Sequence, residues 1–206
     1  MTRSQDRPLS PDDLDDDPLA QFAAWFELAT AGNSPEPHAM ALATATADGR
    51  PSVRMVLMKD WGERGITFFT NYGSRKAAEL EHNPRAALLF YWPQLGRQVR
   101  IEGGVRRAER ADSVAYAQSR SRASQLSALA SPQSRPVPTR EWLEERVAAL
   151  DREHTSSELP VSEEWGGFLL EPEAWEFWQH RANRLHDRFR YERSPNGAWT
   201  IERLGP

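Results

Sequence analysis

The stretch HAMALATATADGRPSVRMVLMK, residues 38–59, decides the fold. Both of its halves, 38–46 and 51–59, have the pattern of β-strands. The dipeptide Asp48-Gly49 lies between them, and Asp-Gly is a strong signal for a tight hairpin turn. We therefore expect two neighbouring antiparallel strands at this point of the chain.

Further strands and a few helices are expected on both sides of this hairpin. The other strand-like segments are 65–70, 85–92, 97–109, 166–170, 174–180, 184–193 and, after the turn Asn196-Gly197, 198–204. Helices are expected over 18–30, 74–82, 111–130 and 139–153. This pattern predicts an α+β fold, a closed antiparallel barrel in one domain over residues 17–206. Residues 1–16, rich in Asp and Pro, are expected to form a flexible or loosely docked acidic arm.

Composition limits the possible functions. The 206 residues carry a net charge of −4, so the protein as a whole is not expected to bind nucleic acid. There is no Cys, which excludes disulfides and thiol nucleophiles and suits a cytoplasmic protein. We expect no membrane partner, because no apolar run reaches the roughly 18 residues that a membrane span needs. The His residues lack the spacing of metal ligands, so no metal site is expected.

The tripeptide Ser74-Arg75-Lys76 places two cations at the expected start of a helix. The helix dipole favours negative charge there, so the two cations oppose it. A bound phosphate would turn this conflict into an anion site. The alternative is a pair of solvated surface charges, because the dipole penalty is below about 1 kcal/mol.

A second cationic group lies in RLHDRFRY, residues 184–191. On a strand, alternate side chains share a face, which here would carry Arg184, His186, Arg188 and Arg190. Four potential cations in a row repel one another, so the face should contact either water or an anion. The aromatic segment 175–178 precedes it, and an aromatic wall beside cations suits a flat, phosphorylated ligand.

Two further groups are weaker signals. Tyr116, Arg120 and Ser124 are four residues apart, so one continuous helix would place them on one face as hydrogen-bond donors. A polar helix face needs no ligand to explain it. Arg54 and Lys59 bracket an apolar strand, and in a flat strand they face opposite ways unless a bulge intervenes.

These clusters, in this order, resemble the pyridoxine/pyridoxamine 5'-phosphate oxidase family. The matching stretches are RMVLMK (54–59), FFTNYGSRKAAELEHNPRAALLFYW (68–92), RQVRIEG (97–103), YAQSRSRASQLSALASPQS (116–134), WGGF (165–168) and EFWQHRANRLHDRFRY (176–191). The resemblance runs from about Asp17 to the RLGP at 203–206. It implies an antiparallel split β-barrel with flanking helices and with FMN at a homodimer interface.

The resemblance also implies a set of cofactor contacts. For the FMN phosphate they are Arg54, Arg75 and Lys76, with Gln133 and Ser134 approaching from the partner subunit. The isoalloxazine and ribityl groups are lined by the backbone of Arg54, Met55, Val56, Leu57, Met58 and Lys59, together with Phe69 and Thr70. The other expected FMN contacts are Gln98, Trp178 and Arg188.

By the same resemblance, four residues hold the substrate phosphate: Lys59, Tyr116, Arg120 and Ser124. Arg184 and His186 lie over the substrate ring as the candidate catalytic pair, where His186 orients the substrate or accepts a proton. The implied reaction is the oxidation of pyridoxamine or pyridoxine 5'-phosphate to pyridoxal 5'-phosphate, with O2 reduced to H2O2. The alternatives are a phenazine-type flavin oxidase and a non-catalytic flavin- or haem-binding module.

Two features depart from the family pattern. Many members carry an Arg and a Tyr in the N-terminal arm that fold over the substrate, and the Asp-rich arm here has no such pair. After Trp178 the chain reads QHRAN, where the family more often has a Gly. Both departures concern how the substrate is enclosed, and neither touches the expected FMN contacts.

Overall fold

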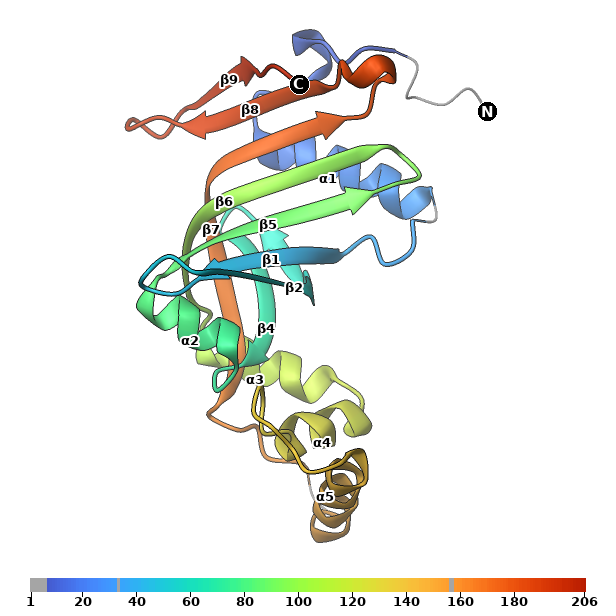
Figure 1. The fold of residues 1–206 in the computed structure, drawn as a ribbon, viewed down its shortest axis with the longest axis vertical. Helices are drawn as coiled ribbons and strands as arrows, with labels where there is room; N and C mark the ends of the chain where they lie inside the picture. The colour runs from blue at the N-terminus through green and yellow to red at the C-terminus, as the bar shows by residue number, and fades with distance from the viewer. Residues whose placement is uncertain (1–6, 33, 156–157) are drawn as a thin grey trace.

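The computed structural model describes residues 7–32, 34–155 and 158–206. Among these residues, nine strands form a single antiparallel sheet (Figure 1). The strands are β1 (Ala39–Ala45), β2 (Pro51–Leu57), β3 (Asp60–Gly62), β4 (Gly65–Asn71), β5 (Arg85–Trp92), β6 (Arg97–Arg107), β7 (Trp165–Gln179), β8 (Asp187–Arg193) and β9 (Trp199–Arg203). The α-helices are α1 (Pro18–Ala31), α2 (Arg75–His82), α3 (Arg110–Ser119), α4 (Arg122–Ala130) and α5 (Arg140–Glu153). Two short 3-10 turns are η1 (Pro11–Asp13) and η2 (Ala182–Arg184).

The hairpin expected around Asp48-Gly49 is confirmed. Strands β1 and β2 pair from Ala39↔Leu57 to Ala45↔Pro51, and Gly49 takes a φ of 83° at the turn. The sheet continues in the order β2-β1-β5-β6-β7-β4-β3, with β8 paired to β7 and β9 to β8. It curls so that β2 and β4 approach each other, but the two are not neighbours in the sheet. The barrel is therefore open along this side, where the sequence pattern predicts a closed one.

Strand β7 is one long strand where the sequence pattern predicts two, 166–170 and 174–180. Its first half pairs with β4, and its second half pairs with β8 along the same edge. Pro172 does not end the strand, because the register with β6 shifts beside it, between Glu102 and Gly103. The bulge lets a single strand serve both ends of the molecule.

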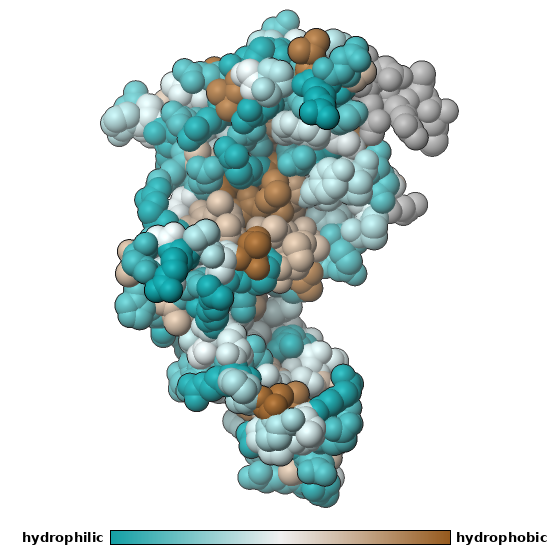
Figure 2. Space-filling model, in the orientation of Figure 1, coloured by the Kyte–Doolittle hydropathy of each residue, from teal (hydrophilic) through white to brown (hydrophobic). Residues whose placement is uncertain are grey.

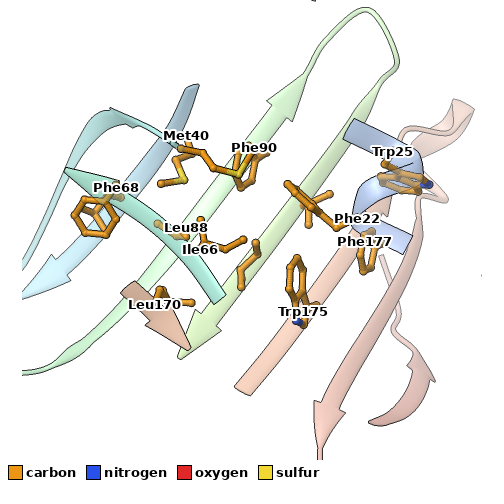
Figure 3. Close-up of a cluster of buried hydrophobic side chains, with 14 of the residues drawn as sticks. Phe22, Trp25, Met40, Ile66, Phe68, Leu88, Phe90, Leu170, Trp175 and Phe177 are labelled. Atoms are coloured by element: carbon orange, nitrogen blue, oxygen red, sulfur yellow. The ribbon is translucent and has the colours of Figure 1, made fainter. Parts of the chain in front are cut away.

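Helix α1 covers the inner face of the sheet and supplies the centre of the core (Figures 1 and 3). The Phe22 ring lies 5.2 Å from that of Phe90 and 5.5 Å from that of Trp175. Trp25 packs edge-on against Phe177 at 5.2 Å. Each fully buried aromatic side chain stabilises the fold by about 2–3 kcal/mol. Asp17 caps the helix as expected, accepting a hydrogen bond from the Leu19 N–H at 3.0 Å.

Two predicted elements are wrong at the places where the site residues lie. The helix predicted over 111–130 is interrupted at Arg120, whose ψ of 155° is extended, and Ser121 caps the next helix. The strand predicted over 184–193 begins only at Asp187. Arg184 has a φ of 63°, which a strand does not allow. It ends a short 3-10 turn, η2 (Ala182–Arg184), and His186 lies in the loop that joins this turn to β8.

The acidic arm expected over residues 1–16 is described from Arg7 onward. In this part Leu9 is buried, and its N–H donates to the Asp187 carboxylate at 3.0 Å. The Tyr191 hydroxyl donates to the Asp15 carbonyl at 2.8 Å. Residues 7–16 are therefore docked on the sheet. Within the described ranges, no helix is both long and apolar enough to cross a membrane.

Candidate active site

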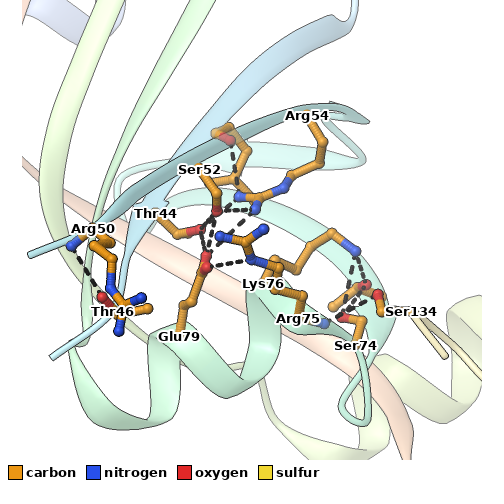
Figure 4. Close-up of polar contacts among 12 residues, drawn as sticks. Thr44, Thr46, Arg50, Ser52, Arg54, Ser74, Arg75, Lys76, Glu79 and Ser134 are labelled. Atoms are coloured by element: carbon orange, nitrogen blue, oxygen red, sulfur yellow. Dashed lines mark hydrogen bonds and ion pairs between the residues drawn. The ribbon is translucent and has the colours of Figure 1, made fainter. Parts of the chain in front are cut away.

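The start of α2 carries two cations, as the sequence predicts, but Ser74 does not cap the helix with its side chain. Instead the Lys76 ammonium lies 3.1 Å from the Thr70 hydroxyl and 3.4 Å from that of Ser74 (Figure 4). Ser74 is fully buried and Thr70 nearly so. The lysine is thus folded back over the end of β4, where its ammonium group and two hydroxyl groups form a small polar cradle.

Arg54 reaches the same place from the middle of β2. Its Nη1 donates to the Leu42 carbonyl at 3.1 Å and to the Thr44 hydroxyl at 2.5 Å. The buried carboxylate of Glu79 lies 3.4 Å from its Nη2. Glu79 also accepts from the Arg75 Nε at 2.8 Å, so one carboxylate holds both arginines (Figure 4).

The electrostatics of this group favour an anion. Burial lowers the pKa of Lys76, and the nearby positive charge of Arg54 lowers it further. Burial alone would raise the pKa of Glu79, but hydrogen bonds from Ser52, Thr44 and Arg75 outweigh it and lower that pKa to about 2. Lys76 and Arg54 therefore repel each other across a partly buried space, and a phosphate between them would relieve that repulsion.

A cleft of about 510 Å³ opens beside these cations. Most of the expected cofactor and substrate residues line it together, from four separate segments: Arg54, Met55, Val56, Leu57, Lys59, Phe69, Thr70, Lys76, Tyr116, Arg120 and Ser124. Of the expected residues between positions 54 and 76, two do not line the cleft. The Met58 side chain is buried in the core, although the contact expected of Met58 is through its backbone, and the Arg75 side chain is 63% exposed on the outside of α2.

An aromatic stack forms one wall of the cleft. Phe69 lies 4.3 Å from Tyr116 and 5.5 Å from Trp165, with its ring nearly parallel to both. Lys59 approaches the Tyr116 ring at 5.7 Å, and the Arg120 guanidinium lies 5.2 Å from Trp165. The wall therefore presents flat apolar faces with cations at their edges, as a planar phosphorylated ligand requires.

Sequence reasoning missed two residues that line this cleft, Trp165 and Ser121. Trp165 begins the WGGF stretch, which carried the family resemblance but no role. Ser121 accepts from the Ser124 N–H at 3.3 Å, and the two hydroxyls lie 2.9 Å apart. A Ser three residues before another polar residue is a capping signal that also indicates the helix break.

Within one chain, Ser134 already lies beside the start of α2, where its hydroxyl accepts from the Arg75 N–H at 3.2 Å. Its approach from a partner subunit stays a prediction. Gln133 lies beside Ser134 and lines an adjoining cleft with Thr70 and Trp165. The loop after α4 thus folds back onto the start of α2 within one chain.

The remaining expected cofactor contacts form a separate group. Gln98, Trp178 and Arg188 stand opposite one another on β6, β7 and β8, so their side chains form one row across the outer face of the sheet. None of the three lines the 510 Å³ cleft. We call these three residues the outer row.

The loop before β8 adds Arg184 and His186 to this second group. The His186 ring lies 4.6 Å from Trp178 and 5.3 Å from His180. The Arg181 backbone N–H donates to the His186 Nδ1 at 3.1 Å. A backbone N–H can only donate, so Nδ1 is an acceptor and the neutral imidazole carries its proton on Nε2.

Between the cleft and the outer row, the outer face of the sheet is apolar (Figure 2). Val53 and Met55 are 68% and 65% exposed, and Tyr91 is 57% exposed. Met55 is in register with Ala41, and Ala41 with Leu89, so the exposed apolar side chains are contiguous across three strands. Large contiguous apolar patches of this kind are typical of protein interfaces.

Two family models match the chain. The one described as pyridoxamine 5'-phosphate oxidase matches residues 27–152. The other, described as the pyridoxine 5'-phosphate oxidase C-terminal dimerisation region, matches residues 165–206. The chain is 52% identical to the pyridoxine/pyridoxamine 5'-phosphate oxidase of Rubrobacter xylanophilus, over 96% of this chain and 91% of the relative. It is 51% identical to that of Salinibacter ruber, over 96% and 93%.

Solved structures share the fold. PhzG from Burkholderia lata, in complex with tetrahydrophenazine-1-carboxylic acid, superposes with a TM-score of 0.91 at 35% identity, over 98% of this chain and 100% of that one. A pyridoxamine 5'-phosphate oxidase-related, FMN-binding protein of Nostoc punctiforme has a TM-score of 0.71 at 21% identity, over 96% and 98%. The antiparallel split barrel with flanking helices is confirmed.

Proposed function

Since the chain belongs to the pyridoxine/pyridoxamine 5'-phosphate oxidase family, we propose that it converts pyridoxamine and pyridoxine 5'-phosphate to pyridoxal 5'-phosphate with FMN as cofactor. When bound, FMN supplies the redox chemistry: a hydride leaves C4' of the substrate, and O2 takes up the electrons as H2O2. With pyridoxamine 5'-phosphate, water replaces the amine and ammonia leaves. The residues of the chain bind and orient the two reactants.

The cations at β2 and α2 are the proposed grip for the FMN phosphate. Arg54 and Lys76 line the cleft and repel each other, and the Thr70 hydroxyl adds a hydrogen-bond partner. Charge-assisted hydrogen bonds to phosphate are about twice as strong as neutral ones. The donor set present therefore fits a phosphomonoester, and the apolar strand 55–57 extends from it as a wall for the isoalloxazine.

The substrate phosphate is assigned to the opposite part of the same cleft. Two cations and two hydroxyls line it there, from Lys59, Tyr116, Arg120 and Ser124. These residues share the cleft although α3 and α4 are separate helices. The observation that carries the proposal is this pair of cationic grips in one aromatic-walled cleft. One grip anchors the flavin and the other the far end of the substrate, so the two rings are held against each other.

We propose that the site is completed by a second copy of the chain. In one chain the outer row, Arg184 and His186 lie away from the cleft, and the apolar outer face between them is exposed. The match to a dimerisation region over residues 165–206 supports a homodimer. In this arrangement the outer row of one subunit contacts the flavin in the cleft of the other.

Arg184 and His186 are then the proposed residues over the substrate ring. Arg184 is exposed in the turn before β8, so its guanidinium is available to stack on a ring. His186 offers an Nε2–H, because its Nδ1 is already occupied by the Arg181 N–H. We therefore assign His186 to orienting the substrate by hydrogen bonding, and not to accepting a proton.

A phenazine-type oxidase is the second candidate, because PhzG is 35% identical and shares the fold. The curated relatives at about 50% identity favour the vitamer phosphate. A phenazine substrate carries no phosphate, so a grip of Lys59, Tyr116, Arg120 and Ser124 would have no partner on it. A substrate comparison separates the two candidates.

The test is flavin reduction followed by turnover. Anaerobic addition of pyridoxamine 5'-phosphate to the FMN-loaded protein should bleach the flavin absorbance, and air should restore it with H2O2 formed. Arg120→Ala should lower kcat/KM for pyridoxamine 5'-phosphate by about 10–100-fold, and much less for free pyridoxamine, which lacks the phosphate. A flavin bleached by tetrahydrophenazine-1-carboxylic acid, and not by pyridoxamine 5'-phosphate, would assign the second candidate.

A further inference from the structure

The guanidinium of Arg188 in the outer row is held from two sides. Its Nε donates to the Glu176 carboxylate at 2.8 Å, and its Nη1 donates to the Gly205 carbonyl at 2.7 Å. A guanidinium has five N–H groups, so three remain for another partner. The side chain is 26% exposed, which leaves those donors accessible from the outer face.

The segment that supplies the Gly205 carbonyl is itself fixed to β8. The Leu204 N–H donates to the Arg188 carbonyl at 2.9 Å, which continues the sheet pairing past the end of β9. Arg203 donates to the Asp187 carboxylate at 2.9 Å and to the Leu9 carbonyl at 2.7 Å. Residues 203–205 therefore lie along β8 in a fixed register, with the Gly205 carbonyl directed at Arg188.

Glu176 holds the other side of the guanidinium and is itself fixed. It is 7% exposed, and its second oxygen lies 2.7 Å from the Arg100 Nη2, an ion pair that lacks hydrogen-bond geometry. The hydrogen bond from Arg188 to Glu176 raises the pKa of Arg188, as a stable ion pair does. A buried carboxylate held between arginines of the two strands that flank its own, β6 and β8, restricts both of them.

We propose that residues 204–206, together with Glu176, form a positioning element that presents Arg188 to the flavin of the partner subunit. This inference rests on the proposed function, in which Arg188 contacts FMN. The segment and the Glu176 carboxylate accept from two of the five N–H groups of Arg188. The other three N–H groups therefore face outward before the cofactor binds. Pre-organisation lowers the entropy lost on binding, so removing the groups that hold Arg188 should weaken FMN binding.

The test is FMN affinity of the apoprotein, measured by quenching of flavin fluorescence. A chain ending at Arg203 loses the Gly205 carbonyl and should bind FMN about 10-fold more weakly or worse. Glu176→Gln leaves residues 204–206 in place and removes the charge on the other side of Arg188, so it should weaken FMN binding to a similar degree. Gly205→Ala is the matched control, because it keeps the carbonyl and a Cβ there meets nothing within 4 Å. It should bind FMN like the unmodified chain.

A double-mutant cycle tells positioning from general stabilisation. In an Arg188→Ala background, removing residues 204–206 should have no further effect on FMN affinity. An equal loss in both backgrounds, or no loss in the unmodified one, would overturn the inference. The melting temperature of the apoprotein reports a loss of the fold, and the mass measured by light scattering reports a loss of the dimer. If the unmodified chain binds no FMN, the proposed function fails instead.

Discussion

Glu79 is a carboxylate buried among the cations proposed to hold a phosphate. It accepts from Ser52 and Thr44 at 2.5 Å each and from Arg75 at 2.8 Å. Burial by itself disfavours its charge, but these donors lower its pKa from 4.5 to about 2. Glu79 is therefore charged throughout the physiological range, and it holds the arginines in place when the site has no anion.

This shift predicts a pH dependence of stability. The folded pKa lies below the unfolded value, so Glu79 stabilises the fold above pH 4.5, and that stability is lost as pH falls toward 2. Its size is about 1–2 kcal/mol after solvent screening, since the Arg75 partner is 63% exposed. The test is urea unfolding of the apoprotein. The difference in free energy of unfolding between wild type and Glu79→Gln should be largest above pH 5 and should become smaller in acid.

The control is Glu81→Gln on the same helix. Glu81 is 45% exposed and pairs with Arg107, and exposed pairs contribute less than about 1 kcal/mol. The free energy of unfolding of Glu81→Gln should therefore differ little from that of wild type at every pH. A Glu79→Gln difference that stays constant down to pH 2 would contradict the lowered pKa.

A second residue-scale prediction concerns the tautomer of His186. The Arg181 N–H occupies Nδ1, so the ring can only donate, through Nε2. His186→Gln places an amide N–H near Nε2 and should keep kcat/KM within about 10-fold of wild type. His186→Asn places its amide near Nδ1 and should lose more. Equal losses, with a changed acid limb of the pH–rate profile, would instead indicate a proton acceptor.

Residues in short motifs could be assigned from the sequence, and residues placed by loop paths could not. Arg54 and Lys76 belong to strand and helix segments whose local pattern fixes their position, and both line the cleft. Ser134 lies in the loop between α4 and α5, and whether that loop contacts its own chain depends on tertiary packing. Trp165 carried no charge or spacing signal, although it stacks on Phe69.

At the scale of elements, β6 and β7 connect the two ends of the molecule through the bulge at Gly103. A Cβ on Gly103 would lie 1.9 Å from the Glu171 carbonyl oxygen, a backbone atom that cannot move aside. Gly103→Ala should therefore destabilise the protein by about 2–4 kcal/mol, measured by urea unfolding. Gly104→Ala is the control, since a Cβ there meets only the end of the Glu173 side chain, at 3.7 Å. Similar losses in both variants would show that the bulge relaxes.

The same elements explain which predictions failed. Local pattern located almost every strand and helix, but the segment 111–130 contains no Gly or Pro to announce its break at Arg120. The break depends on capping by Ser121 and on Gln125, whose amide donates to the Arg120 carbonyl at 2.8 Å. Tyr116, Arg120 and Ser124 still share the cleft, because two helices at an angle converge on it where one continuous helix was expected.

At the scale of the whole molecule, the expected site is split between two places in one chain. The cleft lies at one end of the exposed apolar face, and the outer row lies on the strands at the other. No sequence pattern shows this division of the site. The register of paired strands determines which residues are neighbours within one sheet, but not which residues meet between two subunits. If two copies cover that face, each site takes its cleft from one subunit and its outer row from the other.

This arrangement predicts complementation between two inactive variants. Lys76→Ala damages the cleft, and Arg184→Ala damages the loop beside the outer row, so each homodimer should lose most of its activity. In a mixed dimer one site receives both defects and the other receives none. Unfolding and refolding equal amounts together should produce half mixed dimers, and therefore about one quarter of wild-type activity. The measurement is H2O2 release by the refolded mixture, with each variant refolded alone as the control. A mixture no more active than its components would place cleft and outer row in the same chain's site, and the apolar face would then need another explanation.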